Sequence, residues 1–285
     1  MNAAAPVPDD LRATVERALA EDLGAGDLTA QLVPAQQDAR AALIAREAAV
    51  ICGRPWFDEV FRQLDPRIAV DWEIAEGAES VPAQRLCTLR GPARPILSGE
   101  RTALNFLQTL SGTATTTRAF VRAVAGTGAQ IVDTRKTLPG LRSAQKYAVR
   151  CGGGVNHRMG LYDAILIKEN HVAAAGGVAQ AIARARAGAA GVPLMCEAEN
   201  LDELEAALAA DVDLVLVDDF PLETLRAAVR RVHAHRAHGG RTLLEYSGGT
   251  TLERVRAIAE TGVDRISIGA LTKHLRAVDL SLRFL

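Results

Sequence analysis

The later part of the sequence alternates short apolar runs with amphipathic segments, and this alternation restricts the fold more than any other feature. Six runs rich in leucine and β-branched residues have the length of buried strands: 130–133, 164–167, 193–196, 214–217, 242–245 and 265–268. The segments between them that have helical spacing are 143–149, 178–187, 201–209, 222–235 and 252–260. Strands that are each followed by a helix predict a parallel sheet covered by helices.

Two architectures fit this pattern. Six strands indicate an α/β barrel that is open, rather than the full barrel of eight strands. A doubly wound open sheet is the alternative, because periodicity alone does not separate the two. No GxGxxG motif follows a strand, so a dinucleotide site is not expected.

The earlier part of the chain has a different pattern of apolar residues. Apolar positions with helical spacing predict a helix from 9 to 22, which is followed by two glycines that end it. From 38 to 90, short apolar runs separated by glycine and proline are typical of strands. A longer helical stretch follows from 96 to 125, and we expect a break in it near Ser111 and Gly112.

The charge and the apolar runs exclude several classes of protein. The formal net charge is −1 at pH 7, so binding along nucleic acid or to an anionic membrane is not expected. No apolar run approaches the roughly 20 residues of a membrane helix, and residues 1–10 lack the features of a secretory signal. The widely spaced Cys52, Cys87, Cys151 and Cys196 predict reduced, buried thiols. We therefore expect a cytoplasmic protein.

Lysine is rare in this chain. Of the 33 lysines and arginines only four are lysines: Lys136, Lys146, Lys168 and Lys273. Because arginine supplies positive charge almost everywhere else, a lysine indicates a position that needs a compact point charge or a titratable amine. Three of the four lie close together in the sequence, which predicts that this segment carries chemistry.

Polar residues follow the expected strands where a barrel would place its active site. In α/β barrels the reactive side chains collect at the C-terminal ends of the strands. The polar segments at these ends are 133–136, 168–171, 197–199, 218–219, 245–249 and 269–270. Randomly distributed surface charge would not follow the strand ends, so these segments are expected to surround one site.

Four acids at the strand ends are candidates for metal binding. Glu197 and Glu199 are two residues apart and would share a face of a strand. Together with Asp218, they could hold a divalent cation through oxygen ligands. Alternatively, Glu199 belongs to the N-terminus of the next helix, where the helix dipole favours acids. We retain Glu197 and Asp218 as site residues, ahead of Glu199 and Asp219.

Two glycine turns predict a phosphate site. Ser247, Gly248 and Gly249 follow a strand and precede a helix, so their backbone N–H groups can close on an anion. Gly269 and Ala270 end the next strand. One such turn is commonly structural, but adjacent glycine turns on the last two strands of a barrel are typical of a phosphate site.

Four cations are expected around the same pocket: Arg135, Lys136, Arg158 and Lys168. Arginine binds carboxylates through two hydrogen bonds, whereas lysine serves phosphate as a point charge. This combination suits ligands with several carboxylates and phosphates. The alternative for Arg158 is a surface loop, and His157 beside it is expected to donate a hydrogen bond rather than to act as a base.

These motifs, taken together, resemble the quinolinate phosphoribosyltransferase family, also called nicotinate-nucleotide pyrophosphorylase (carboxylating). The similar segments occur in order and span nearly the whole chain: 21–29, 100–105, 133–142, 145–149, 152–158, 166–171, 197–199, 217–220, 247–249 and 269–272. One departure is Met195, which stands where many members have an acid. Glu197 stays in register, so activity is still expected.

The resemblance implies a fold and an activity. It implies an N-terminal α/β sandwich domain, 1–115, and a C-terminal open TIM-like α/β barrel, 116–274, with the tail 275–285 packing on the first domain. It implies transfer of phosphoribosyl from phosphoribosyl pyrophosphate to quinolinate, with decarboxylation, to give nicotinate mononucleotide, pyrophosphate and CO2. Magnesium is the implied cofactor. A homodimer with shared sites is implied as well, in which Arg101 reaches the site of the other chain.

The resemblance also implies roles for individual residues. Quinolinate would be bound by Arg101, Thr134, Arg135, His157, Arg158 and Lys168. Phosphoribosyl pyrophosphate would be bound by Arg46, Lys136, Glu197, Asp218, Ser247, Gly248, Gly249, Gly269, Ala270 and Lys273. The catalytic residues would be Lys136, Lys168, Glu197 and Asp218, and the magnesium ligands would be Glu197 and Asp218.

Three alternatives stay open at this point. The nearest is a pyrophosphorylase-like paralogue associated with molybdate transport, although segments 156–158 and 167–171 look like those of the quinolinate enzyme. Lys168 at a strand end could instead form a Schiff base, as in a barrel lyase. A barrel that binds phosphate without catalysis is the third.

Overall fold

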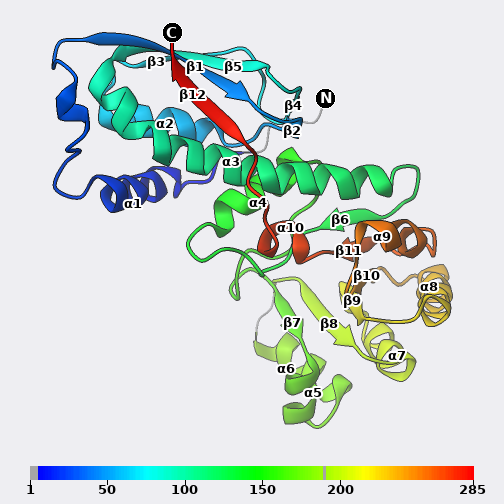
Figure 1. Cartoon of the computed structure of the whole chain (residues 1–285). Coiled ribbons are helices and arrows are strands. Elements are labelled where there is room, and N and C mark those ends of the chain that lie inside the picture. Colours follow the sequence, from blue (N-terminus) through cyan, green and yellow to red (C-terminus); the bar gives the residue numbers. More distant parts are fainter. Residues whose placement is uncertain (1–5, 189–190) are drawn as a thin grey trace. The chain divides into compact units, whose positions relative to one another are not determined.

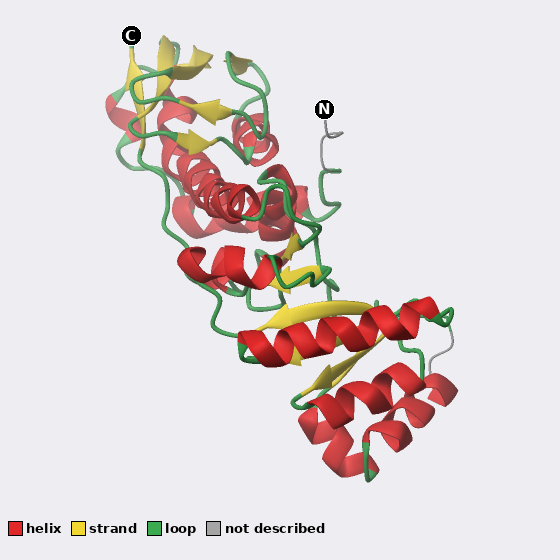
Figure 2. Ribbon diagram, turned by 90° about the vertical axis from the view of Figure 1, so that its right-hand side faces the viewer, coloured by secondary structure: helices red, strands yellow, loops and turns green. Residues whose placement is uncertain are grey.

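The computed structural model describes residues 6–188 and 191–285. The chain divides into two compact units, drawn in Figures 1 and 2. The first unit consists of Met1–Arg118, Thr137–Gly153 and Ala270–Leu285, and the second consists of Ala119–Lys136 and Gly154–Gly269. The domain boundaries expected from the family, 1–115 and 116–274, stay a prediction.

The first unit is built on a four-stranded antiparallel sheet in the order β12-β1-β5-β3. Its strands are β1 (Asp38–Ala45), β3 (Ala69–Trp72), β5 (Arg85–Pro92) and β12 (Leu280–Phe284). The red strand β12 lies beside the blue strand β1 in Figure 1, and the register pairs Leu43 with Leu282. A small second sheet pairs β2 (Ala49–Val50) with β4 (Glu79–Ser80).

Helix α2 (Arg54–Leu64) lies in the region where only strands were expected. Pro55 stands in its first turn, where no N–H partner is lost. Its buried residues Trp56, Phe57, Val60 and Phe61 follow helical spacing. Aromatic and β-branched residues favour strands, so the composition concealed this helix and the expectation was wrong.

Helix α3 (Ala93–Ala123) is continuous, so the expected break near Ser111 and Gly112 was wrong as well. A Cβ on Gly112 would lie 2.2 Å from the carbonyl oxygen of Arg276. The glycine therefore allows a neighbouring backbone to approach the helix and does not interrupt it. The hydroxyl of Ser111 accepts a hydrogen bond from the backbone N–H of Cys52 at 2.9 Å.

The core of the first unit is aromatic and aliphatic. Trp56 packs edge-on against Tyr147, with ring centroids 5.2 Å apart, and Phe57 packs in the same way against Phe61 at 5.1 Å. The remaining helices of this unit are α1 (Leu11–Leu23), η1 (Ala30–Leu32), α4 (Arg142–Cys151) and α10 (Ala270–Lys273). Helix α4 was expected as the first barrel helix, but it belongs to this unit.

The second unit contains a six-stranded parallel sheet in the order β6-β11-β10-β9-β8-β7. The strands are β6 (Gln130–Val132), β7 (Ile165–Ile167), β8 (Leu194–Ala198), β9 (Leu214–Asp218), β10 (Leu243–Ser247) and β11 (Arg265–Ser267). From β7 to β11, each strand lies beside the strand that follows it in the sequence. Strand β6 lies on the other side of β11. A doubly wound sheet would instead reverse its strand order in the middle. Since β6 and β7 form the two edges, the open barrel is confirmed.

Helices follow the strands and cover the outer side of the barrel (Figures 1 and 2). They are α5 (Glu169–Ala175), α6 (Val178–Gly188), α7 (Leu201–Ala209), α8 (Leu222–Ala237) and α9 (Leu252–Ala259). Helix α8 buries Leu225, Ala228, Val229 and Val232, which form one stripe at helical spacing. The short helix α5 was not expected. Among the described residues, no helix is long and apolar enough to span a bilayer.

Candidate active site

A cavity of about 420 Å³ opens at the C-terminal ends of the barrel strands. This volume lies within the range of small-molecule sites. Its lining residues all belong to the second unit: Thr134, Arg135, Lys136, His157, Arg158, Leu166, Lys168, Glu197, Leu216, Asp218, Glu245, Ser247 and Ser267. Polar and charged groups therefore converge on one cavity above an apolar sheet.

The structure brings together nine of the residues that were expected in the site: Thr134, Arg135, Lys136, His157, Arg158, Lys168, Glu197, Asp218 and Ser247. Gly248, Gly249 and Gly269 belong to the same unit without lining the cavity. Arg46, Arg101, Ala270 and Lys273 belong to the first unit. A role for these four residues in the site stays a prediction.

Asp133 organises the segment that carries His157 and Arg158. It is wholly buried at the end of β6. Its carboxylate accepts hydrogen bonds from Asn156 Nδ2 at 2.6 Å and from the backbone N–H of His157 at 2.9 Å. A buried carboxylate with charge-assisted hydrogen bonds holds this segment in one conformation, so Asp133 positions the residues that line the cavity.

The tautomer of His157 follows from its neighbours. Its Nδ1 accepts a hydrogen bond from the backbone N–H of Arg158 at 2.7 Å. In the neutral ring the proton must then reside on Nε2. This Nε2 atom lies 3.6 Å from Oε1 of Glu245. The geometry agrees with the expectation that His157 donates a hydrogen bond.

Two arginines, Arg135 and Arg158, line the same cavity. Burial lowers the pKa of Arg158, and the nearby positive charge of Arg135 lowers it further. Only Asp163 opposes this shift. Two neighbouring guanidinium groups in a partly desolvated site favour a ligand with more than one negative charge.

Lys168 and Glu197 form an ion pair at the ends of the neighbouring strands β7 and β8. Lys168 Nζ donates to Glu197 Oε2 at 2.5 Å. Burial raises the pKa of Glu197, the charge of Lys168 opposes the rise, and the charge of Asp218 adds to it. The pair of carboxylates thus carries more negative charge than Lys168 alone offsets, which suits a cation.

Lys168 also begins helix α5. Its backbone N–H donates to His171 Nδ1 at 3.0 Å, and the backbone N–H of His171 returns to the carbonyl oxygen of Lys168 at 2.8 Å. This reciprocal cap fixes the start of the helix. His171 therefore holds the backbone from which the Lys168 side chain extends.

The alternative for Glu199 is supported by the structure. Asn200 caps helix α7 with its side chain, and the backbone N–H of Glu199 donates to Glu203 at 2.8 Å. Glu199 does not line the cavity. Asp219 does not line it either, and it lies near the hydroxyl of Tyr246 at 3.5 Å.

The turn after β10 needs glycine. Gly248 has a φ of +140°, and a Cβ there would lie 3.0 Å from Oδ1 and 3.1 Å from Cα of Asp219. A side chain at this position would therefore collide with a neighbouring backbone. The tight turn places Ser247 at the cavity just before α9 begins at Leu252.

Four lining residues had been given no individual role: Leu166, Leu216, Glu245 and Ser267. Glu245 lies in segment 245–249, which was expected at the site. It is wholly buried in β10, and neither carboxyl oxygen has a hydrogen-bond partner of normal geometry. Burial raises its pKa to about 7, with Ser267 and Arg265 opposing the rise and Asp133 adding to it. One signal was available in the sequence: Glu245 and Ser247 are two residues apart, so they face the same side of the strand.

An open α/β barrel with cations, paired carboxylates and a glycine turn around one cavity defines a class of barrel enzymes that bind small anions. The chain belongs to the quinolinate phosphoribosyl transferase family, since the family's N-terminal and C-terminal domains match residues 27–111 and 113–283.

Individual relatives extend this similarity over nearly the full length. The chain is 45% identical over 281 residues to nicotinate-nucleotide pyrophosphorylase (carboxylating) of Mycobacterium leprae, covering 96% of this chain and 97% of the relative. It is 40% identical over 263 residues to a probable enzyme of the same name from Bacillus subtilis, covering 92% and 89%. The structure of nicotinate-nucleotide pyrophosphorylase from Francisella tularensis superposes with a TM-score of 0.93, at 45% identity and with 100% of both chains covered.

Proposed function

We propose that this chain is a pentosyltransferase that joins quinolinate to phosphoribosyl pyrophosphate. The products are nicotinate mononucleotide, pyrophosphate and CO2, as in NAD biosynthesis. The observation that carries this proposal is the cavity that Arg135 and Arg158 line together with the Lys168–Glu197 pair. The family membership supports the same reaction.

Quinolinate is proposed to lie against the arginines. Its two carboxylates would offset the repulsion between Arg135 and Arg158, which lowers the pKa of Arg158 in the free site. His157 lines the same cavity and is proposed as a further contact of quinolinate. Several fixed donors orient the ring so that its nitrogen faces the ribose, and positioning is the main requirement for this step.

During the transfer, charge develops on the ribose and on the departing pyrophosphate. As pyrophosphate leaves ribose C1, the sugar becomes positive and the leaving group becomes more negative. Lys136 and Lys168 line the cavity and would stabilise the leaving group as point charges. After the pyridine nitrogen bonds to C1, the C2 carboxylate leaves as CO2. The electron pair left on C2 is stabilised by the cationic ring nitrogen until a proton is added.

No side-chain nucleophile is needed, and Lys168 is not placed as one. Schiff-base formation requires a neutral amine. The Nζ of Lys168 is instead engaged by Glu197, to whose Oε2 it donates at 2.5 Å. This contact argues against the alternative of a barrel lyase.

We also propose magnesium as the cofactor, held by Glu197 and Asp218. Both carboxylates line the cavity, and the charge of Asp218 raises the pKa of Glu197, so a divalent cation between them would relieve their repulsion. Magnesium is commonly held by one or two carboxylates, with water and substrate phosphates as the other ligands. When bound, it would neutralise charge on the departing pyrophosphate.

The 5′-phosphate is proposed to lie at the turn formed by Ser247, Gly248 and Gly249. The positive φ of Gly248 opens the backbone, and helix α9 begins directly after the turn. Arg46, Gly269, Ala270 and Lys273 are proposed as further phosphate contacts. A cytoplasmic homodimer in which Arg101 serves the site of the other chain completes the proposal.

Substrate choice tests the proposed reaction. The protein is incubated with phosphoribosyl pyrophosphate, magnesium and either quinolinate, nicotinate or nicotinamide, and mononucleotide is measured. Quinolinate should be used far better than nicotinate, because a missing carboxylate leaves a partly buried cation unpaired at a cost of several kcal/mol. Comparable kcat/KM values for quinolinate and nicotinate would overturn the assignment.

A further inference from the structure

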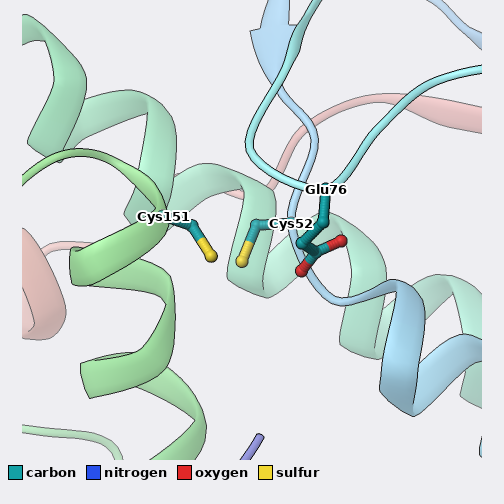
Figure 3. Close-up of side chains that lie close together, drawn as sticks. All are labelled: Cys52, Glu76 and Cys151. Atoms are coloured by element: carbon teal, nitrogen blue, oxygen red, sulfur yellow. The ribbon is translucent and has the colours of Figure 1, made fainter. Parts of the chain in front are cut away.

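Two cysteines and a glutamate meet in the first unit, far from one another in the sequence. The side chains of Cys52, Glu76 and Cys151 are drawn in Figure 3, where the two sulfur atoms and the carboxylate face a common space. One ligand atom from each lies within 4.8 Å of the others. Among the described residues, no other group of three potential metal-ligating side chains was found this close together.

We propose that Cys52, Glu76 and Cys151 form a binding site for a soft divalent cation of the zinc type. A tetrahedral zinc ion has Zn–S distances of about 2.3 Å and Zn–O distances of about 2.0–2.2 Å, which places its ligand atoms roughly 3.5–3.8 Å apart. The observed separations therefore allow coordination after small side-chain rotations. Thiolate ligands select zinc over magnesium, so this site differs chemically from the barrel site.

The three ligands lie on segments that hydrogen bonds already hold together. The carboxylate of Glu76 accepts from the backbone N–H of Gly53 at 2.7 Å and of Arg54 at 3.2 Å. This ties Glu76 to the residue that follows Cys52 and to the start of helix α2. The carboxylate is thereby fixed beside the sulfur of Cys52 while lone pairs stay available for a cation.

Arg118 fixes the third ligand. Its guanidinium donates to the carbonyl oxygen of Cys151 at 3.0 Å, of Gly152 at 2.9 Å and of Gly77 at 3.4 Å. Cys151 at the end of α4 is thus linked to the turn that contains Glu76. Arg118 also pairs with the carboxylate of Glu79 at 3.0 Å, so its position is fixed from both sides.

The two cysteines differ in exposure, and this difference gives an ion a route into the site. Cys52 is wholly buried, whereas Cys151 is partly exposed. An ion can therefore enter from the side of Cys151, and the fourth coordination position is left for water. The site would join the start of α2, the turn after β3 and the end of α4, which indicates a structural role.

Cobalt(II) provides the most direct test, because it reports thiolate ligation. The full-length protein is freed of metal with a chelator and titrated with Co²⁺. We expect a sulfur-to-cobalt charge-transfer band in the wild type. Cys52→Ser and Cys151→Ser should lose this band, and Glu76→Gln should weaken binding at least about tenfold. Cys87→Ser and Cys196→Ser are matched controls that should keep it, since neither belongs to the cluster.

Native mass spectrometry with Zn²⁺ gives the stoichiometry. The wild type should hold one zinc ion per chain more than Cys151→Ser, and zinc should raise its Tm by several degrees without raising that of the variant. The partly exposed Cys151 makes this the variant expected to fold, which circular dichroism verifies. The absence of a cobalt band in the wild type would overturn the proposal. Persistence of the cobalt band in Cys52→Ser and Cys151→Ser would also overturn it. So would a Cys52–Cys151 disulfide that forms under peroxide at the same rate with saturating zinc as without zinc.

Discussion

Two glutamates, one in each unit, differ in their hydrogen bonds: Glu76 of the first unit is half-buried, and Glu245 of the second unit is wholly buried. Glu76 in the first unit receives two backbone N–H groups, from Gly53 and Arg54. Glu245 in the barrel receives no hydrogen bond of normal geometry. Buried polar groups are normally satisfied within the protein, so Glu245 is the exception of the two.

The arginines show the same contrast. Arg118 in the first unit donates to three carbonyl groups and to the carboxylate of Glu79. Arg158 in the barrel is desolvated beside another arginine. The first unit uses its polar groups to hold its own structure. In the barrel, burial and the charge of Arg135 instead lower the pKa of Arg158.

The largest expected effect comes from changing the shape of a cavity cation. Lys168→Arg should lower kcat/KM about 1,000-fold, because a planar guanidinium cannot replace a compact ammonium placed 2.5 Å from Glu197. Steady-state kinetics with both substrates measures this. The exposed change Arg226→Lys on α8 is the control and should be neutral. Near-normal activity of Lys168→Arg would mean that the cavity requires charge alone.

The next effect concerns stability and the unsatisfied Glu245. Its pKa is raised from the ordinary glutamate value of 4.5, which applies to the unfolded chain, to about 7 in the folded protein. The folded state therefore binds the proton more tightly, and stability present below pH 4.5 is lost as the pH rises to about 7. Glu245→Gln should remove this loss, so that the variant gains up to about 3 kcal/mol relative to the wild type above pH 7.

Urea denaturation of the substrate-free protein between pH 4.5 and 8 measures the difference. The exposed Glu199→Gln serves as a control, since Glu199 does not line the cavity. Parallel stability profiles for the wild type and Glu245→Gln would show that Glu245 is already satisfied, and the contrast with Glu76 would disappear.

A somewhat smaller effect is expected from the carboxylates. Glu197→Gln or Asp218→Asn should lower kcat about 100-fold and raise the magnesium concentration that is required. Quinolinate affinity, measured by calorimetry, should change little. Loss of quinolinate affinity with unchanged magnesium dependence would reverse the roles assigned to the two sides of the cavity.

The smallest expected effect is a partial recovery of activity, which tests whether Arg101 of the first unit contributes to the active site of another chain. Arg101→Ala and Lys168→Ala are each expected to be inactive. If sites are shared in a two-fold dimer, mixing the two variants with subunit exchange should restore roughly a quarter of the wild-type activity, because half of the dimers gain one intact site. No recovery, with exchange confirmed independently, would exclude a shared site.

The sequence predicted the barrel well because its strands are short, apolar and regularly spaced, and because active residues follow strand ends. It concealed α2, whose buried Trp56, Phe57 and Phe61 are residues that also favour strands. It gave Glu245 no individual role, because the sequence does not show that the Glu245 carboxylate is wholly buried without hydrogen-bond partners. The meeting of Cys52 with Cys151 depends on tertiary packing alone. Lys146 lies in the segment 143–149 that was expected to be helical, and the structure places it in α4, buried at 1% exposure.

The pairing of β12 with β1 has a consequence for how the chain is made. Residues 41–45 pair with residues 280–284, so β1 is synthesised long before its partner. During translation one edge of β1 stays open while the barrel segments emerge. Such an edge can pair with another nascent chain, and closing so distant a contact is slow. We expect the barrel segments to acquire structure on the ribosome before the first sheet does, and shortened chains that lack β12 to aggregate.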